Sequence, residues 1–319
     1  MHLSEINFVD LYIGHDYHEI KGMKGGATLL APLPVDLSND VACLKDMCIE
    51  KMEKTGRNEF PIFYDDRLYR ITVSTDVRER RTIVIRQTHH EIADITILGY
   101  PSEFINILSD TSANGLIVIS GLMGAGKTTS AAASLSFRLS KTSALGVAIE
   151  DPVEVMLEGK HGDGRCFQMD VSEHNGYSNA SKKALRMGVS NLFIGEIRDA
   201  ESAYEALKSS MNGLMVIVTI HAASHIDAIK KIVTLCNERV PDSHKLLSGS
   251  IIAVAHQTLS PIYKNGFLSD FRVGVNVINF YSGDSKDKLA LALSQNDLKS
   301  LKNELVVIRN KFLNNGGKD

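Results

Sequence analysis

Short strand-like runs and one helical stretch make up the hydrophobic pattern of the first hundred residues. Four segments alternate in polarity or run apolar, as half-buried strands do: residues 9–13, 60–64, 68–73 and 82–86. Between the first two, residues 40–54 carry apolar side chains at helical spacing. This pattern predicts a small α+β domain. A polar stretch over residues 87–94 then leads to Pro101 and to a helix predicted over residues 102–108.

The pattern changes after this stretch to an alternation of buried strands and helices. Apolar, β-branched runs occupy residues 115–120, 144–149, 192–194 and 214–220, with helical segments between them. Alternation of this kind predicts a mostly parallel sheet with helices on both faces. We therefore expect two domains, an N-terminal domain with its linker over residues 1–97 and an α/β domain over residues 98–319.

Residues 121–128 follow the first of these strands and read G-L-M-G-A-G-K-T. They match the phosphate-binding loop G-x-x-x-x-G-K-[ST] at every defined position, and an Ala-rich helix follows. Backbone amides of such a loop surround phosphates, its lysine bridges the β- and γ-phosphates, and its threonine hydroxyl completes a Mg²⁺ shell. The sequence therefore predicts ATP and Mg²⁺ as ligands. The expected nucleotide contacts are Gly121, Met123, Gly124, Ala125, Gly126, Lys127, Thr128 and Thr129.

Polar residues follow the other strands of the predicted sheet as well. Glu150 ends the second strand, Glu196 follows the third and His221 follows the fourth. Carboxyl ends of parallel strands meet at one edge of a sheet, so these side chains should converge on the nucleotide. One carboxylate is needed to activate water and another to hold Mg²⁺ through its waters. We expect Lys127, Glu150, Glu196 and His221 to be catalytic, and Thr128 and Glu196 to hold the metal; which glutamate activates water stays open.

Composition limits the alternatives. The net charge is −3 and the pI is about 6.4, which disfavours a protein that grips nucleic acid along its surface. No apolar run approaches the length of a membrane-spanning helix, and the N-terminus does not resemble a signal peptide, so we expect a cytoplasmic protein. The four cysteines lack C-x-x-C spacing. His221 and His225 are four positions apart, but no third zinc ligand is apparent near them.

Taken together, these segments resemble the secretion ATPases of type II secretion, type IV pili and type IV secretion. Their order in that family is Walker A, an Asp box similar to I-E-D-P-x-E, a Walker B segment ending in G-E-x-R-D, and a His box similar to T-x-H. Here they read 121–128, Ile149 to Glu154, Gly195 to Asp199 and Thr219 to His221. More weakly, Asp10 to Ile13 resembles an S-D-L-H segment, and Gln257 to Leu259 a Q-x-L segment.

The resemblance implies a RecA-like P-loop ATPase domain preceded by a small α+β, PAS-like domain. It further implies a homo-hexameric motor that works with a platform protein at the inner membrane of a bacterium, where it is a peripheral protein. In this family nucleotide lies between the two domains, and arginines of the N-terminal domain reach the phosphates. Arginines in the corresponding region are Arg70, Arg78, Arg80, Arg81 and Arg86, of which Arg70, Arg78 and Arg86 are our candidates.

Departures from the family pattern favour its compact branch, which includes pilus retraction and Dot/Icm-like or conjugative secretion ATPases. A tetracysteine module and a long N-terminal extension are absent from this sequence. The A-I-R-N-L-I-R-like motif of retraction motors is also not seen, and residues 297–313 instead have heptad-like leucine spacing, as in a docking helix. Two alternatives stay open: a RecA-like nucleic-acid translocase and a weakly hydrolysing regulatory subunit.

Overall fold

The computed structural model describes residues 2–23, 28–88, 91–264, 267–281, 284–295 and 297. Internal contacts divide the chain into two compact units. Unit 1 comprises Met1–Glu91 and Pro152–Met156, and unit 2 comprises Ile92–Asp151 and Leu157–Asp319. No local pattern in the sequence indicates that the short segment Pro152–Met156 groups with the first unit. The heptad-like helix expected over residues 297–313 lies outside the described residues, except for Asp297.

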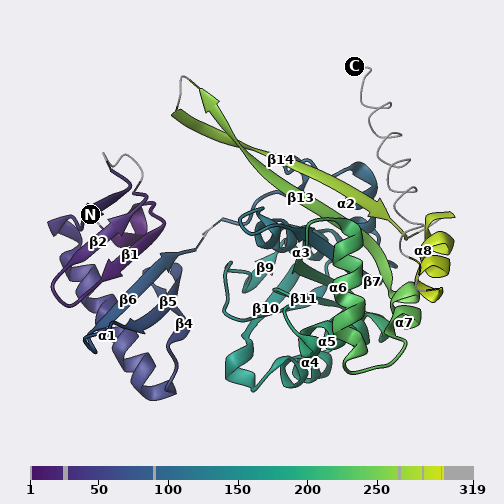
Figure 1. Ribbon diagram of the computed structural model, residues 1–319, viewed down its shortest axis with the longest axis horizontal. Coiled ribbons are helices and arrows are strands. Elements are labelled where there is room, and N and C mark those ends of the chain that lie inside the picture. Colours follow the sequence, from purple (N-terminus) through teal and green to yellow (C-terminus); the bar gives the residue numbers. More distant parts are fainter. Residues whose placement is uncertain are drawn as a thin grey trace. The chain divides into compact units, whose positions relative to one another are not determined.

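Unit 1 contains an antiparallel sheet with the strand order β3-β2-β1-β6-β5-β4 (Figure 1). Its strands are β1 (Asp10–Ile13), β2 (His18–Lys21), β3 (Leu30–Pro32), β4 (Glu59–Tyr64), β5 (Arg67–Thr75) and β6 (Arg81–Gln87). A long helix, α1 (Ser38–Thr55), follows the short 3-10 turn η2 (Val35–Leu37), and another such turn, η1 (Leu3–Glu5), precedes the sheet. The α+β character expected for this region is confirmed.

Hydrophobic spacing explains the core of unit 1. Val41, Leu44 and Cys48 are fully buried on one face of α1, at the helical spacing seen in the sequence. The helix ends at Gly56, whose φ of 68° closes the last turn with a hydrogen bond from its N–H to Met52 O (2.7 Å). Strand β2 was not predicted because only Ile20 among its residues is buried, which leaves no alternating pattern to detect.

Unit 2 is built on a mostly parallel sheet, as the sequence predicted. Eight of its described segments form strands in the order β14-β13-β7-β12-β11-β8-β10-β9, and only the two outermost pairs are antiparallel. The strands are β7 (Gly115–Gly121), β8 (Leu145–Glu150), β9 (Gly159–His161), β10 (Gly164–Asp170), β11 (Asn191–Ile194), β12 (Met215–His221), β13 (Ile251–Lys264) and β14 (Phe267–Asn279). Figure 1 shows β13 and β14 as a long hairpin extending beyond the rest of this sheet.

Helices cover both faces of this sheet. A continuous core joins one set of strand side chains to α4 (Tyr177–Arg186), α5 (Ala200–Met211), α6 (His225–Asn237), α7 (Ser243–Ser250) and α8 (Asp284–Ser294). The alternate residues of the same strands, such as Ile117, Phe193 and Ile217, are also fully buried. They face the other side of the sheet, where α3 (Lys127–Thr142) and α2 (Ser102–Ser109) lie. The turns η3 (Ile95–Ile97) and η4 (Val171–His174) complete the unit.

Strand register fixes the place of the site in unit 2. Gly121 at the end of β7 pairs with His221 of β12 on one side and with Gln257 of β13 on the other. The ends of β7 and β12 and the middle of β13 therefore lie at the same level, next to the loop that leads into α3. Of the helices in the described part of the chain, none combines the length and the apolar character needed to span a membrane.

Candidate nucleotide site

The loop between β7 and α3 has the form of an anion site. Gly124 and Gly126 have φ values of 74° and 79°, a left-handed backbone that L side chains rarely adopt. Gly126 stands directly before α3, and in the described part of the chain no side chain caps that helix. The partial positive charge at this end of the helix favours a negatively charged ligand. At the loop tip, Met123 is 87% exposed.

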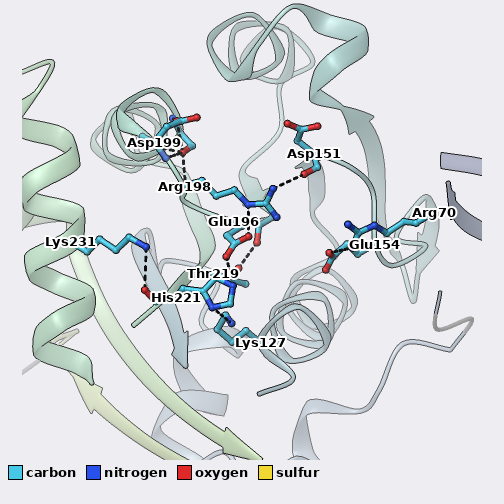
Figure 2. A network of polar contacts seen from close by, with 12 residues as sticks. Arg70, Lys127, Asp151, Glu154, Glu196, Arg198, Asp199, Thr219, His221 and Lys231 are labelled. Atoms are coloured by element: carbon cyan, nitrogen blue, oxygen red, sulfur yellow. Dashed lines mark hydrogen bonds and ion pairs between the residues drawn. The ribbon is translucent and has the colours of Figure 1, made fainter. Parts of the chain in front are cut away.

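Lys127, His221 and Glu196 form a chain of contacts beside this loop (Figure 2). Lys127 Nζ donates to Leu122 O (3.0 Å) and lies 3.2 Å from His221 Nδ1. On the other side of the ring, His221 Nε2 lies 2.9 Å from Glu196 Oε1. These residues come from α3, the end of β12 and the segment after β11, so the predicted convergence of Lys127, Glu196 and His221 is seen within unit 2.

Electrostatics favour the neutral form of His221. Burial lowers the pKa of His221 below its usual value, the Lys127 ammonium lowers it further, and Glu196 opposes this shift. A lysine ammonium can only donate, so Nδ1 must accept and the ring proton resides on Nε2, the nitrogen nearer to Glu196. The imidazole therefore links a cation to a carboxylate without carrying charge itself.

Glu150 lies at the end of β8 and is 1% exposed. Its Oε1 accepts a hydrogen bond from Gln168 Nε2 of β10 (2.7 Å). A Cβ atom at Gly195, the residue before Glu196, would come within 2.8 Å of Glu150 Cγ, so the absence of a side chain at Gly195 makes room for this glutamate. Glu196 is the more accessible of the two carboxylates, with 16% of its side chain exposed.

The segment after β11 holds Glu196 on its other side. Arg198 Nε donates to Glu196 Oε2 (2.5 Å), and Thr219 Oγ1 donates to Gly195 O (2.5 Å). Asp199 caps α5 instead of pointing to the phosphate loop, because its Oδ1 accepts from Ser202 N (2.8 Å). The two polar residues after Glu196 thus have different structural roles.

The sequence model of the family named Type II/IV secretion system protein matches residues 64–268, well over half of the chain. This chain belongs to that family. The match includes the phosphate loop, Glu150, Glu196 and His221. The resemblance drawn from the four sequence segments is therefore confirmed.

Two relatives in sequence and one solved structure illustrate the similarity. The competence protein ComGA of Streptococcus pneumoniae is 34% identical over 166 residues, which cover 50% of each chain. The type IV pilus retraction ATPase PilT of Pseudomonas aeruginosa is 32% identical over 149 residues, 46% of this chain and 42% of PilT. A solved structure of the pilus retraction motor PilT with bound ADP superimposes with a TM-score of 0.76 at 21% identity, over 95% of this chain and 86% of that one.

This structural match confirms the predicted α/β fold class. In sequence, the chain spans about half the length of the first curated relatives it matches.

The three candidate arginines all belong to unit 1. Arg70 pairs with Glu154 of the Asp box, which is grouped with the same unit (Figure 2). Arg86 makes a two-pronged contact with Asp10, from Nε to Oδ1 (2.7 Å) and from Nη2 to Oδ2 (3.2 Å). Arg78 is an exposed turn residue whose backbone N–H donates to Asp76 Oδ1 (2.8 Å). Two of the three guanidinium groups thus have carboxylate partners inside unit 1.

The donor set around the phosphate loop is suited to Mg²⁺ with a bound triphosphate. Among the described residues, no group of three or more His, Cys, Asp and Glu side chains is placed to hold a metal. Mg²⁺ usually keeps several waters and takes one or two protein ligands together with phosphate oxygens, so it does not need such a group. A hydroxyl at Thr128 and a carboxylate at Glu196 are ligand types of this kind.

Sequence reasoning missed the structural roles of three residues that support the site. Gln168 binds Glu150, Arg198 binds Glu196, and Gln257 binds the phosphate loop itself. Arg198 had a detectable signal, because it stands two positions after Glu196 in the Walker B segment. Gln168 lies on a strand that was not predicted, and only the three-dimensional pairing of β10 with β8 brings it to Glu150.

Proposed function

We propose that this chain binds ATP with Mg²⁺ at the phosphate loop of unit 2, hydrolyses it, and works as a motor of a pilus or secretion system. One observation carries the proposal: His221 contacts Lys127 on one side and Glu196 on the other, beside the N-terminus of α3. A glycine-rich turn without a ligand would not need a buried lysine next to a carboxylate-bound histidine.

The residues have separable roles in the proposed reaction. The N-terminus of α3 and the ammonium of Lys127 bind the phosphates and stabilise the charge on the transferring phosphoryl group. Glu196, with Arg198 and His221 on its two oxygens, orients and deprotonates the attacking water. Mg²⁺, held by Thr128 and through water by Glu196, would neutralise phosphate charge. Buried Glu150 supports the Walker B segment through its packing against Gly195.

Assembly into a homo-hexamer is part of the same proposal and rests on the family resemblance. A ring of this kind would be cytoplasmic, associate peripherally with the inner membrane through a platform protein, and use arginines such as Arg70, Arg78 or Arg86 near nucleotide. The name of PilT refers to type IV pili and that of ComGA to competence. The family name includes type II and type IV secretion. A nucleic-acid translocase is less well supported, because the chain has a net charge of −3.

Phosphate release by the purified protein tests this proposal. We expect Mg²⁺-dependent ATP turnover per subunit to increase with protein concentration as rings form, and to be unaffected by added DNA. Mixing in Lys127→Ala subunits should reduce turnover more than dilution alone if subunits act together. Turnover stimulated by DNA would favour the translocase, and an absence of turnover in an assembled wild-type ring would contradict the proposed hydrolysis.

A further inference from the structure

Gln257 is a buried polar residue that the proposed reaction does not use. It lies on β13, where it pairs in register with Gly121 at the start of the phosphate loop. Only 3% of its surface is exposed. A buried primary amide must satisfy both its N–H donors and its oxygen to avoid an energetic cost, so its partners indicate its role.

The amide of Gln257 contacts three separate segments of unit 2. Its Nε2 donates to Ala125 O of the phosphate loop (2.6 Å). Its Oε1 accepts from Ser130 Oγ of α3 (2.7 Å) and from Tyr100 OH just before α2 (3.0 Å). All three partners are buried. The donor and the acceptor of one side chain thus tie the loop to the helix that follows it.

Close packing restricts the loop further. A Cβ at Gly121 would lie 2.4 Å from the backbone oxygen of Gln257, and a Cβ at Gly126 would lie 2.9 Å from its Nε2. The loop therefore touches β13 at both its ends. Loss or displacement of the Gln257 side chain would remove the hydrogen bond that holds the Ala125 carbonyl in place.

We propose that Gln257 is a positioning residue that holds the phosphate loop in the conformation that binds nucleotide. It contacts no reacting group and acts through the Ala125 carbonyl. The inference rests on the proposed function, because it assumes that the loop binds a nucleotide. It goes beyond that function by assigning the shape of the loop to a side chain 132 positions away from Ala125.

A pair of near-isosteric variants tests the proposal. Gln257→Met keeps the shape of the side chain but removes the amide. Asn191→Leu does the same to another fully buried amide of unit 2, one that binds Arg138 instead of the loop. We expect Gln257→Met to raise the Kd for a fluorescent ADP analogue about tenfold or more. Asn191→Leu should lower the melting temperature and leave this Kd within about twofold of wild type.

A second variant uses protonation to restore the lost contact. In Gln257→Glu, a carboxylate oxygen would face Ala125 O and repel it, whereas the protonated acid can donate to that carbonyl and accept from Ser130 and Tyr100. Burial raises the pKa of such a carboxyl group. The affinity of Gln257→Glu for the ADP analogue, divided by that of wild type, should therefore increase as the pH falls from about 8 to about 6. The same ratio for Gln257→Met should stay constant.

The outcomes separate the two proposals. If wild-type protein fails to bind the ADP analogue, the proposed function fails. If wild type binds and a folded Gln257→Met protein binds equally well, only the role of Gln257 is overturned. A constant ratio for Gln257→Glu over the pH range would also contradict it, since the contact with Ala125 would then not control affinity.

Discussion

Lys127 Nζ lies 3.2 Å from His221 Nδ1, so the ammonium faces an imidazole nitrogen that carries no proton. The opposite nitrogen of the same ring lies 2.9 Å from Glu196. A protonated ring would place two cations in contact, which explains why the Lys127 charge contributes to the lowered pKa of His221. The phosphate loop and the Walker B carboxylate are thereby connected through a neutral group.

Removing the lysine charge should change the titration of the histidine. In Lys127→Met, we expect the pKa of His221 to rise, because an imidazolium ion would no longer be repelled. Histidine NMR signals followed over a pH series measure this directly. Lys141→Met, a substitution in the last turn of α3, is a matched control that should leave the titration unchanged. An unaltered pKa in Lys127→Met would show that the two groups do not interact in solution.

The same lysine should be essential for turnover. Lys127→Ala removes the ammonium proposed to stabilise the transferring phosphoryl group, and we expect kcat to fall by about a hundredfold or more. Phosphate release by the purified variant, compared with Lys141→Ala, provides the measurement. Turnover within about tenfold of wild type would remove the phosphate loop from the proposed mechanism.

Isosteric substitutions distinguish the roles of Glu150 and Glu196. Glu196→Gln keeps the shape but not the basicity of the side chain, so ATP should bind and persist while hydrolysis falls about a hundredfold. Glu150→Gln changes a carboxyl group that is 1% exposed, and we expect it to reduce turnover less. Nucleotide affinity and single-turnover hydrolysis should be measured for both variants. If Glu150→Gln were the nearly inactive protein, water activation would belong to the Asp box.

The pair of Asp10 and Arg86 should contribute to the stability of unit 1. Burial alone would raise the pKa of Asp10, but the hydrogen bond and charge of Arg86, together with Lys21 and Tyr12, outweigh it and the pKa lies below its usual value. Arg86→Ala would leave a carboxylate that is 1% exposed without these bonds. We expect the free energy of unfolding to fall by about 1–3 kcal/mol in urea denaturation, and Asp10→Asn to offset part of this loss.

Arg78→Ala, at an exposed turn, is the control for this experiment and should change stability little. The comparison also tests the nucleotide role suggested by the sequence. Arg86→Ala protein that lost turnover while keeping wild-type stability would show that Arg86 acts on nucleotide more than on Asp10.

Because His225 has a lowered pKa, we expect the folded protein to be less stable in mild acid. This residue begins α6, where burial, together with the nearby His256, lowers its pKa from 6.5 to about 4. Between these values the unfolded chain takes up a proton that the folded protein does not, so the free energy of unfolding should fall as the pH decreases from about 6.5 to about 4. Above about pH 6.5, His225 is neutral in both the folded and the unfolded protein, so this loss of stability does not occur.

Thermal unfolding at a series of pH values checks this prediction. His225→Gln, which keeps a donor near Asn276 O, should show a shallower decline than wild type. His18→Gln, a change of an exposed histidine on β2, should follow the wild-type curve. Equal slopes for wild type and His225→Gln would mean that His225 does not stay neutral in the folded protein.

Local patterns explain why much of this fold could be predicted. The phosphate loop, the strand ends at Glu150, Glu196 and His221, and the face of α1 all depend on residues close together in the sequence. Arg138 shows the limit of such reasoning. As one polar residue of an Ala-rich helix it gave no signal, yet it is 4% exposed and donates to Asp110 O (2.9 Å) and Ala113 O (2.8 Å).

Contacts between distant segments account for the other omissions. Gln257 contacts Ala125 because β13 pairs in parallel with β7, and no spacing rule connects the two positions. Likewise, Gln168 reaches Glu150 through the pairing of β10 with β8. The residues proposed to act on nucleotide follow from sequence motifs, whereas the contacts of Gln257 and Gln168 that hold them in place appear only in the folded chain.

Because Gly195 lies close to Glu150, we expect substitutions at these two positions to depend on each other. A methyl group at position 195 would collide with the Glu150 side chain at 2.8 Å, so alanine can be accepted there only after the residue at position 150 becomes shorter or moves. Related chains that carry a larger residue before the Walker B glutamate should therefore carry a smaller one at the end of the Asp-box strand. Substitutions at the two sites are expected to be compensatory, harmful singly and tolerated as a pair.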